Sequence, residues 1–321
     1  MTHIEKRIAV VGVGAVGGYF GGRLAARGHQ LVFVARGATL QALAARGLVV
    51  HSPLGDLALA PDRFSVCARL DDVGPVDAVL LAVKAWQVAA LAPALLPLLS
   101  EGGVVLPLQN GVEAPQQLVE VLGAERVLGG LCRIMAEQTG PAEIRHFGAV
   151  PEILLGPLGS GASQSARTLS AAQDLAAILE DAGVRCAVRK DITSALWEKL
   201  AFIAAFGGVG AATQSPIGVL RTLPETRALL TAAVGEVCAV AEALGVTLAD
   251  ELPARILAYM DALPAQGTAS LQRDLKAGVP SELDALIGVV PRLGQKVGVP
   301  TPIFSTLYAC LLPNAVRPVA S

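Results

Sequence analysis

The feature that most constrains this chain is a glycine-rich loop between a strand pattern and a helical pattern near its start. A β-rich run, Arg7–Val11, leads into the sequence GVGAVG, and a helical pattern over Ala15–Arg27 follows. In such a loop Gly12 permits the tight turn, Gly14 lets a pyrophosphate approach the backbone, and Gly17 lets helix and strand pack closely. The helix N-terminus adds free N–H groups and a partial positive charge. Because strand, loop and helix occur in this order, the loop predicts a dinucleotide-binding site.

Alternating β-rich runs and helical patterns continue through the first half of the chain. The β-rich runs are Gln30–Ala35, Val76–Val83, Val104–Gln109 and Val184–Val188, with short strands expected within 142–159 and a helix over 163–182. Runs that are hydrophobic on both faces predict a parallel sheet covered by helices. The alternation predicts an α/β fold with a Rossmann-type, doubly wound parallel sheet.

The second part of the chain has a different pattern, in which strand signals are nearly absent. A long helix is predicted from an N-cap at Asp191 through Lys199, and further helices near 223–245, 250–262 and 280–297. The length of 321 residues also favours two domains, since single cores stop growing near ~250–300 residues. We therefore predict a nucleotide-binding domain over 1–188 and an all-helical substrate and catalytic domain over 189–321.

Composition excludes several classes of partner. The net charge of −2 provides no electrostatic footprint for nucleic acid or an anionic membrane. The five cysteines form no C-x-x-C pair, and the four histidines have no metal-binding spacing, so neither a disulfide framework nor a metal site is expected. Free thiols favour a reducing, cytoplasmic compartment. We read the glycine-rich N-terminus as a strand and turn and not as a targeting segment.

The end of the second strand indicates which nicotinamide cofactor the loop would bind. An NAD site usually places Asp or Glu there, on the ribose 2′-hydroxyl. This sequence instead has Val34-Ala35-Arg36-Gly37, with no carboxylate to repel a 2′-phosphate and with a guanidinium to bind one. Arg36 therefore predicts NADP(H) over NAD(H), unless it is an ordinary solvated turn residue.

Two further polar side chains follow predicted strands. Lys84 follows the run Val76–Val83, and Asn110 follows Val104–Gln109. Ligands of open α/β sheets bind at the carboxyl ends of the strands. Lys84 would then hold ribose or phosphate oxygens, and Asn110 would bridge the nicotinamide ribose and the substrate. The alternatives are a surface lysine and an Asn-Gly turn.

In the helical half, Lys199 stands at the head of the apolar run Leu200–Ala212. It either snorkels from a core helix, flanks a membrane span, or works in a closed site. The run is too short for a span, which needs about 20 residues. Asp274 and Glu282, taken alone, are typical of helix-surface or capping charges.

Together these motifs resemble those of the ketopantoate reductase family (2-dehydropantoate 2-reductases), over nearly the whole chain. The motifs are the GVGAVG loop with Arg36, VKAWQ at 83–87, QNG at 109–111, WEK at 197–199, and Ser270 followed by Asp274 and Glu282. The resemblance implies an N-terminal Rossmann domain that binds NADPH and a helical C-terminal domain. It implies reduction of the 2-oxo group of ketopantoate to give pantoate, a step of pantothenate biosynthesis.

The resemblance also implies a role for most of the motif residues. Lys199 would be the general acid that protonates the developing alkoxide, and Glu282 would orient the site and touch the cofactor. Asn110 and Ser270 would hold substrate, whereas Lys84 and Gln87 would serve the cofactor. Asp274 occupies a motif position on the substrate side without an assigned role. The Ala- and Leu-rich helical half could offer an apolar face to a homodimer, but the sequence does not determine the oligomeric state.

The sequence departs from this family at two positions on one predicted helix face. The family commonly has asparagines four and eight residues after the lysine, where this chain has Ile203 and Gly207. The substrate pocket is therefore expected to be more apolar, which leaves a reductase of another 2-oxo acid as an alternative. A non-enzymatic NADP(H)-binding sensor is the alternative from another class, although a sensor needs no proton donor.

Overall fold

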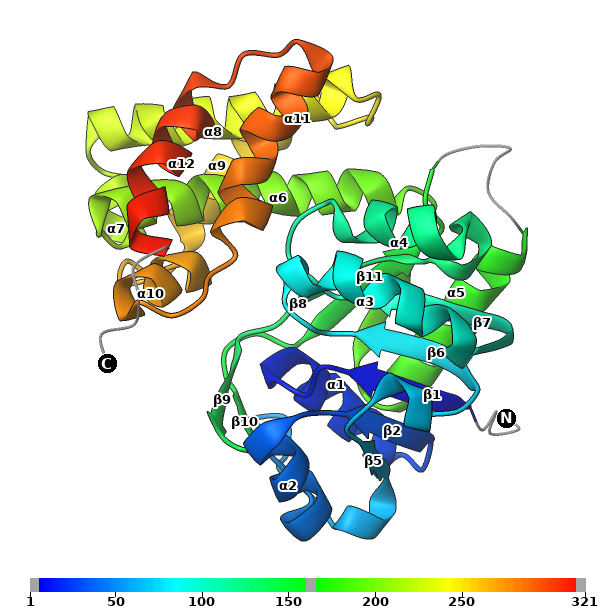
Figure 1. Cartoon of the computed structure of the whole chain (residues 1–321). Coiled ribbons are helices and arrows are strands. Elements are labelled where there is room, and N and C mark those ends of the chain that lie inside the picture. Colours follow the sequence, from blue (N-terminus) through cyan, green and yellow to red (C-terminus); the bar gives the residue numbers. More distant parts are fainter. Residues whose placement is uncertain (1–5, 160–165, 316–321) are drawn as a thin grey trace. The chain divides into compact units, whose positions relative to one another are not determined.

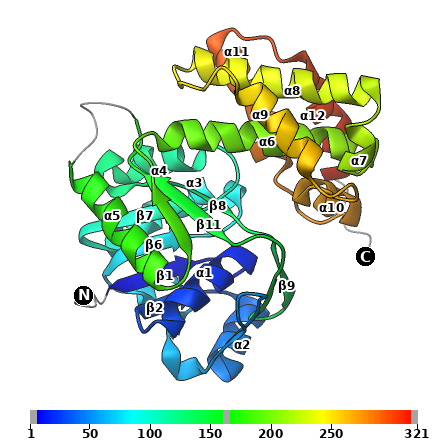
Figure 2. The same ribbon diagram turned by 180° about the vertical axis from the view of Figure 1, so that it is seen from behind.

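The computed structural model describes residues 6–159 and 166–315, and the contacts within it divide the chain into two units (Figures 1 and 2). The first unit contains the residues up to Gln109 together with Glu113–Ile192. The second contains Asn110–Val112 and the residues from Thr193 onward. The contacts thus divide the chain after Ile192, where the sequence suggested residue 188, and they assign the loop that carries Asn110 to the helical unit.

The first unit is built on a five-stranded parallel sheet. Its strands, in spatial order, are β5 (Ser65–Cys67), β2 (Gln30–Val34), β1 (Arg7–Val11), β6 (Val76–Leu81) and β7 (Leu99–Pro107). In β1 and β2 the register runs from Arg7 opposite Gln30 to Val11 opposite Val34. The carboxyl ends of these neighbouring strands are therefore level, and the loops that follow them leave the sheet side by side.

Helices cover both faces of this sheet because its strands are apolar on both faces. Ile8 and Val10 of β1 join one core with α1 (Ala15–Ala26) and α5 (Ala166–Asp181). Ala9 and Val11 join a second core with α3 (Val88–Leu95) and α4 (Ala114–Leu122). The predicted doubly wound sheet is confirmed (Figure 1). Residues 163–165 of the predicted helix 163–182 lie outside the described residues.

Two smaller sheets and one helix complete the first unit. The strands of the four-stranded sheet are β4 (Leu57–Leu59), β3 (Leu48–His51), β10 (Glu143–His146) and β9 (Ala136–Gly140), in that order. The strands of the three-stranded sheet are β12 (Arg185–Val188), β11 (Glu152–Gly156) and β8 (Gly129–Arg133). Helix α2 (Gly37–Arg46) follows β2. The short strands expected within 142–159 correspond to β10 and β11.

The second unit is helical throughout the part that the structure describes, as predicted for the C-terminal region. Its helices are α6 (Ile192–Thr213), α7 (Ile217–Leu220), α8 (Pro224–Ala243), α9 (Leu252–Ala262), α10 (Ser270–Ala277), α11 (Val289–Val297) and α12 (Pro302–Ala315). The helix predicted over 280–297 differs in one respect, because it begins with a π-helical turn, Asp284–Gly288, before α11.

Helix α6 is the central element of the hydrophobic core of the second unit. Leu200, Ala201, Ala204 and Ala205 are each at most 1% exposed. Among the described residues α6 alone is long and apolar enough to cross a membrane, but 72% of its most apolar window is buried inside the protein. Its apolar composition is therefore that of a core helix.

Candidate active site

The glycine loop has the geometry that a phosphate-binding turn requires. Gly12 has φ +97°, and its N–H donates to the carbonyl of Val34 at 3.2 Å. A Cβ at Gly12 would lie 2.8 Å from the carbonyl carbon of Ala82, and one at Gly17 would lie 2.0 Å from the oxygen of Gly12. A Cβ at Gly14 would meet no atom within 4 Å. Gly12 and Gly17 are thus required by the fold, whereas Gly14 leaves open space beside the loop.

The start of α1 offers hydrogen-bond donors to this open space. The helix begins at Ala15 with Gly14 at the N-cap, where no side chain caps it, and its first turn has no acidic residue. The first N–H groups of a helix have no partner within the helix, and its dipole favours an anion there. The loop and helix therefore fit the pyrophosphate of a nicotinamide dinucleotide.

Arg36 lies at the same edge of the sheet as the glycine loop. It follows β2, which is hydrogen-bonded to β1, and its side chain is exposed at the N-cap of α2 without making a capping bond. Its neighbours Ala35 and Gly37 contribute no carboxylate. An exposed guanidinium at this place fits a 2′-phosphate, since guanidinium binds phosphate through paired hydrogen bonds.

Lys84 and Gln87 lie in the turn that follows β6, at the same edge. Lys84 is exposed, and its Nζ lies 5.9 Å from the ring centroid of Trp86. The Oε1 of Gln87 accepts a hydrogen bond from the backbone N–H of Lys84 at 3.2 Å. Gln87 therefore has a structural contact in this turn, which the sequence motif alone did not indicate.

Gln109 is a residue at this edge to which the sequence analysis assigned no role. It is 5% exposed, and its Nε2 donates to the carbonyls of Leu81 at 2.8 Å and Val83 at 2.9 Å. These bonds join the end of β7 to the end of β6 and fix where each following loop begins. The signal in the sequence was a polar residue at the end of the otherwise apolar run Val104–Gln109.

The other predicted residues lie in the second unit, and Lys199 is on α6. Lys199 is half-buried, whereas the nearby residues Trp197 and Leu200 are buried. One and two turns later on the same helix are Ile203, half-buried, and Gly207, buried. Residues four apart lie on one face of a helix. The face that carries Lys199 is therefore apolar along the following two turns.

This face of α6 continues to the start of α10. A Cβ at Gly207 would lie 3.6 Å from the Cβ of Ala269 and 3.5 Å from Leu271, which is ordinary contact. Ser270, between these two residues, is exposed and begins α10, and the half-buried Asp274 follows one turn later. Ser270 and Asp274 thus share a face of α10 beside the apolar part of α6.

The structure joins two predicted residues that are far apart in the sequence. The Nδ2 of Asn110 donates to the Oε2 of Glu282 at 2.9 Å. Both side chains are half-buried and both belong to the second unit. The side chain of Asn110 therefore pairs with a residue of the helical unit, although Asn110 follows a strand of the first unit in the sequence.

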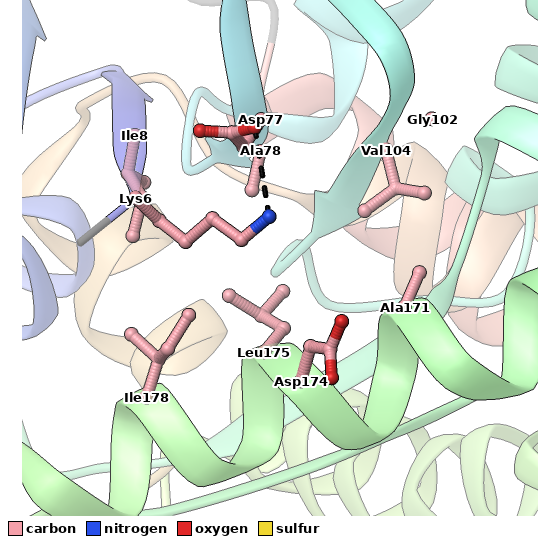
Figure 3. A pocket seen from close by; sticks show the side chains of 10 residues that line it. All are labelled: Lys6, Ile8, Asp77, Ala78, Gly102, Val104, Ala171, Asp174, Leu175 and Ile178. Atoms are coloured by element: carbon pink, nitrogen blue, oxygen red, sulfur yellow. Dashed lines mark ion pairs between the residues drawn. The ribbon is translucent and has the colours of Figure 1, made fainter. Parts of the chain in front are cut away.

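A cavity at the other edge of the sheet is not part of this site. It has a volume of about 60 Å³. It lies between α5 and the amino ends of the strands (Figure 3). Lys6 on its wall pairs with Asp77 at 3.7 Å, and Asp174 of α5 faces the same space. Ligands of open α/β sheets bind at the opposite, carboxyl edge.

Among the described residues no group of three or more His, Cys, Asp or Glu side chains is placed to hold a metal ion.

Comparison with known protein families gives two matches that together span most of the chain. Residues 8–160 match the family described as "Ketopantoate reductase PanE/ApbA". Residues 191–314 match "Ketopantoate reductase PanE/ApbA C terminal". A 2-dehydropantoate 2-reductase of Mesorhizobium japonicum is 31% identical over 332 residues, which cover 97% of this chain and 98% of that protein.

Solved structures give the same result for the fold. The crystal structure of 2-dehydropantoate 2-reductase from Geobacter metallireducens has a TM-score of 0.85 at 31% identity and covers 96% of this chain and 99% of that one. The ternary structure of D-mandelate dehydrogenase with NADH and anilino(oxo)acetate has a TM-score of 0.84 at 22% identity, with 96% and 98% covered. The second likeness concerns the fold alone.

Proposed function

This chain belongs to the ketopantoate reductase family, and from that premise we propose that it reduces a 2-oxo acid with NADPH, with ketopantoate as the first candidate substrate. It is an oxidoreductase of the 2-dehydropantoate 2-reductase type. The observation that carries the proposal is the Asn110–Glu282 pair, which lies in the same unit as Lys199. A nucleotide-binding protein with no reaction to catalyse has no need of these three polar groups.

The residues of the first unit are suited to hold the cofactor. The N–H groups at the start of α1 would bind its pyrophosphate, Arg36 its 2′-phosphate, and Lys84 a ribose or phosphate oxygen. When bound, NADPH supplies a hydride to the carbonyl carbon. Gly14 contributes the open space that the close approach of the pyrophosphate to the backbone requires.

In the second unit, Lys199 would stabilise the negative charge that develops on the substrate oxygen and would then protonate that oxygen. Addition of a hydride to a ketone moves the π electrons to the carbonyl oxygen, which becomes an alkoxide. A nearby ammonium stabilises this charge and then transfers a proton to the oxygen. Asn110 and Ser270 would hold the substrate, Glu282 would orient the group, and Asp274 lies on the same face of α10 as Ser270.

The direct test follows NADPH absorbance with purified protein and ketopantoate. We expect oxidation of NADPH that depends on ketopantoate, and formation of pantoate in equal amount. Replacement of NADPH by NADH should reduce kcat/KM. Binding of NADPH without oxidation by any 2-oxo acid would contradict the proposal and favour the NADP(H) sensor.

A second candidate substrate is a 2-oxo acid with a fully apolar side chain. It is favoured by the half-buried Ile203 and by Gly207, which lies in contact distance of Ala269 and Leu271. No side chain at positions 203 and 207 can form a hydrogen bond with a hydroxyl group of the substrate. The fold does not decide between these substrates, since one fold hosts many functions.

Two substrates that differ by one hydroxyl group distinguish these candidates. 3,3-Dimethyl-2-oxobutanoate is ketopantoate without its hydroxyl. A site that hydrogen-bonds the hydroxyl rejects such an analogue by roughly 10⁴-fold or more, whereas an apolar pocket does not. A kcat/KM for the analogue that equals or exceeds that for ketopantoate would identify the apolar substrate class. In Gly207→Asn, whose Cβ is tolerated at 3.5 Å, the preference should then shift toward ketopantoate.

A further inference from the structure

The segment after Glu282 has an unusual backbone conformation. The residues Asp284–Gly288 form a π-helical turn, which then continues as α11. π-Helical turns are rare and occur frequently at functional sites. The turn begins two residues after Glu282, and the N–H of Leu286 within it donates to the carbonyl oxygen of Glu282 at 3.0 Å, so the backbone of Glu282 is tied to the turn.

Side chains from two other helices anchor the first residue of the turn. The Oδ1 of Asp284 accepts hydrogen bonds from the hydroxyl of Tyr308 on α12 and from Nη1 of Arg292 on α11, both at 3.1 Å. Partial burial and the carboxylate of Asp284 raise the pKa of Tyr308, so its hydroxyl remains a neutral donor. A Cβ at Gly288 would lie 2.6 Å from the Oδ1 of Asp284 and 2.7 Å from the ring of Tyr308. Only glycine at position 288 leaves room for this anchor.

The same turn supports the loop that carries Asn110. Gly111 has φ +102°, and a Cβ there would lie 2.9 Å from the carbonyl oxygen of Ala285. The backbone of the loop therefore packs directly against the π-helical turn. Next to this contact, the side chain of Asn110 donates to Glu282 at 2.9 Å. Position 111 requires glycine for both its backbone conformation and its close approach.

We propose that Asp284 and Tyr308 are positioning residues, which fix the conformation of the π-helical turn. They thereby hold the side chains of Glu282 and Asn110 in their hydrogen-bonded arrangement, which is called their register below. The importance of this register for catalysis rests on the proposed function, whereas its existence does not. Asp284 and Tyr308 themselves act through the turn and not on the substrate.

The asparagine content of the chain provides a readout that does not depend on activity. Asn110 and Asn314 are the only asparagines. In protein labelled with ¹⁵N-asparagine, NMR should therefore show two pairs of side-chain amide signals. Asn314→Ser assigns them, and Glu282→Ala, which removes the acceptor, shows where the Asn110 pair appears without its hydrogen bond.

Tyr308→Phe and Asp284→Ala should both move the Asn110 pair toward its position in Glu282→Ala. The matched control is Asp261→Ala, which removes the ion pair between Arg227 and Asp261 that joins α8 to α9. This control should leave the Asn110 signals in place even if it lowers Tm equally. An unchanged Asn110 pair in folded Tyr308→Phe and Asp284→Ala would overturn the proposal.

Kinetics then relate the register to the reaction. Tyr308→Phe should lower kcat on the order of tenfold, as expected for displaced catalytic groups. In a Glu282→Ala background the same substitution should have little further effect, because both changes act on one carboxylate. Equal effects in the two backgrounds would contradict positioning through Glu282. Altered amide signals in a protein that reduces no 2-oxo acid would retain the positioning and refute the proposed function instead.

Discussion

The edge of the first unit that carries Gly12, Gly17 and Arg36 (the cofactor edge) and the face of α6 that carries Lys199, Ile203 and Gly207 (the lysine face) differ in how they constrain the sequence. At the cofactor edge the main requirements are imposed on the backbone, such as the positive φ of Gly12 and the 2.0 Å approach at Gly17. On the lysine face they are imposed on side chains, at Lys199, Ile203 and Gly207 of α6. Few residues satisfy a backbone requirement, whereas side chains on a helix face can change without changing the fold.

Under the proposed function, this difference predicts that substitutions can change the substrate more easily than the cofactor. Gly12 and Gly17 are enclosed by other backbone atoms, so a larger residue there would displace the loop. Ile203 is half-buried, and the fully buried core positions of α6 are occupied by other residues. Substitutions should accordingly affect structure and cofactor binding in the first unit, and turnover or substrate choice in the second.

The largest effect is expected for Lys199→Ala. Loss of the proton donor should lower kcat by about 10²–10⁴-fold, with the Kd for NADPH little changed, because the cofactor edge belongs to the other unit. The matched control is Glu198→Gln, one residue earlier on α6, which removes a 3.9 Å ion pair with Arg255. Steady-state kinetics and calorimetry measure both quantities. A variant with nearly wild-type kcat would remove Lys199 from the mechanism.

Two glycines of the loop should respond differently to the same methyl group. Gly17→Ala places a Cβ 2.0 Å from the oxygen of Gly12 and should lower the free energy of unfolding by about 1–3 kcal/mol, with loss of NADPH binding. Gly14→Ala meets no atom within 4 Å, so Tm should hold while NADPH affinity falls. Denaturant unfolding and calorimetry distinguish these outcomes. Equal losses of stability in the two variants would contradict the claim that Gly17 is required by the fold and Gly14 by the ligand.

Arg36→Ala should have a smaller and more selective effect. Removal of a charge-assisted hydrogen bond should weaken NADPH binding by roughly tenfold or more, while NADH binding stays the same. Arg46→Ala, at the other end of α2, is the control because it lies away from this edge. Equal losses for NADPH and NADH would mean that Arg36 does not contact the 2′-phosphate.

The smallest effects concern two buried thiols, one in each unit. Burial raises the pKa of Cys186 in the first unit to about 12 and that of Cys238 in the second to about 11, from an ordinary value of 9.0. The folded protein therefore binds these protons more tightly, and stability should decline as pH rises above about 9. Chemical unfolding measured at pH 8 and at pH 10 checks this sign. Cys186→Ala and Cys238→Ala should each reduce the decline.

Alkylation of the same thiols compares the opening of the two units. At pH 8 the exposed Cys310 should react first, and Cys186 and Cys238 only when their cores open. NADPH should slow alkylation of Cys186 more than that of Cys238, since a ligand stabilises the part that binds it. Mass spectrometry of the labelled peptides measures both rates. Equal protection of the two would show that the units open together.

The sequence allowed the architecture of both units to be predicted, but not the contacts between distant residues. The glycine loop and four strands of the parallel sheet follow local sequence patterns, so the doubly wound sheet was predictable except for its edge strand β5. The pairing of Asn110 with Glu282 was not, because it depends on a contact between residues 172 positions apart. Nor was the π-helical turn, since the relation of Asp284 and Gly288 to Tyr308 exists only once the turn and α12 have packed together.

The most direct test of the central claim is transfer of isotope from the cofactor to the substrate. NADPH carrying deuterium at C4 of the nicotinamide, in each of its two stereochemical forms, is incubated with the protein and ketopantoate or its analogue without the hydroxyl. Mass spectrometry of the 2-hydroxy acid should show one deuterium at C2 with one form and none with the other. Absence of deuterium from the product with both forms, while the hydroxy acid is still formed, would contradict hydride transfer from NADPH.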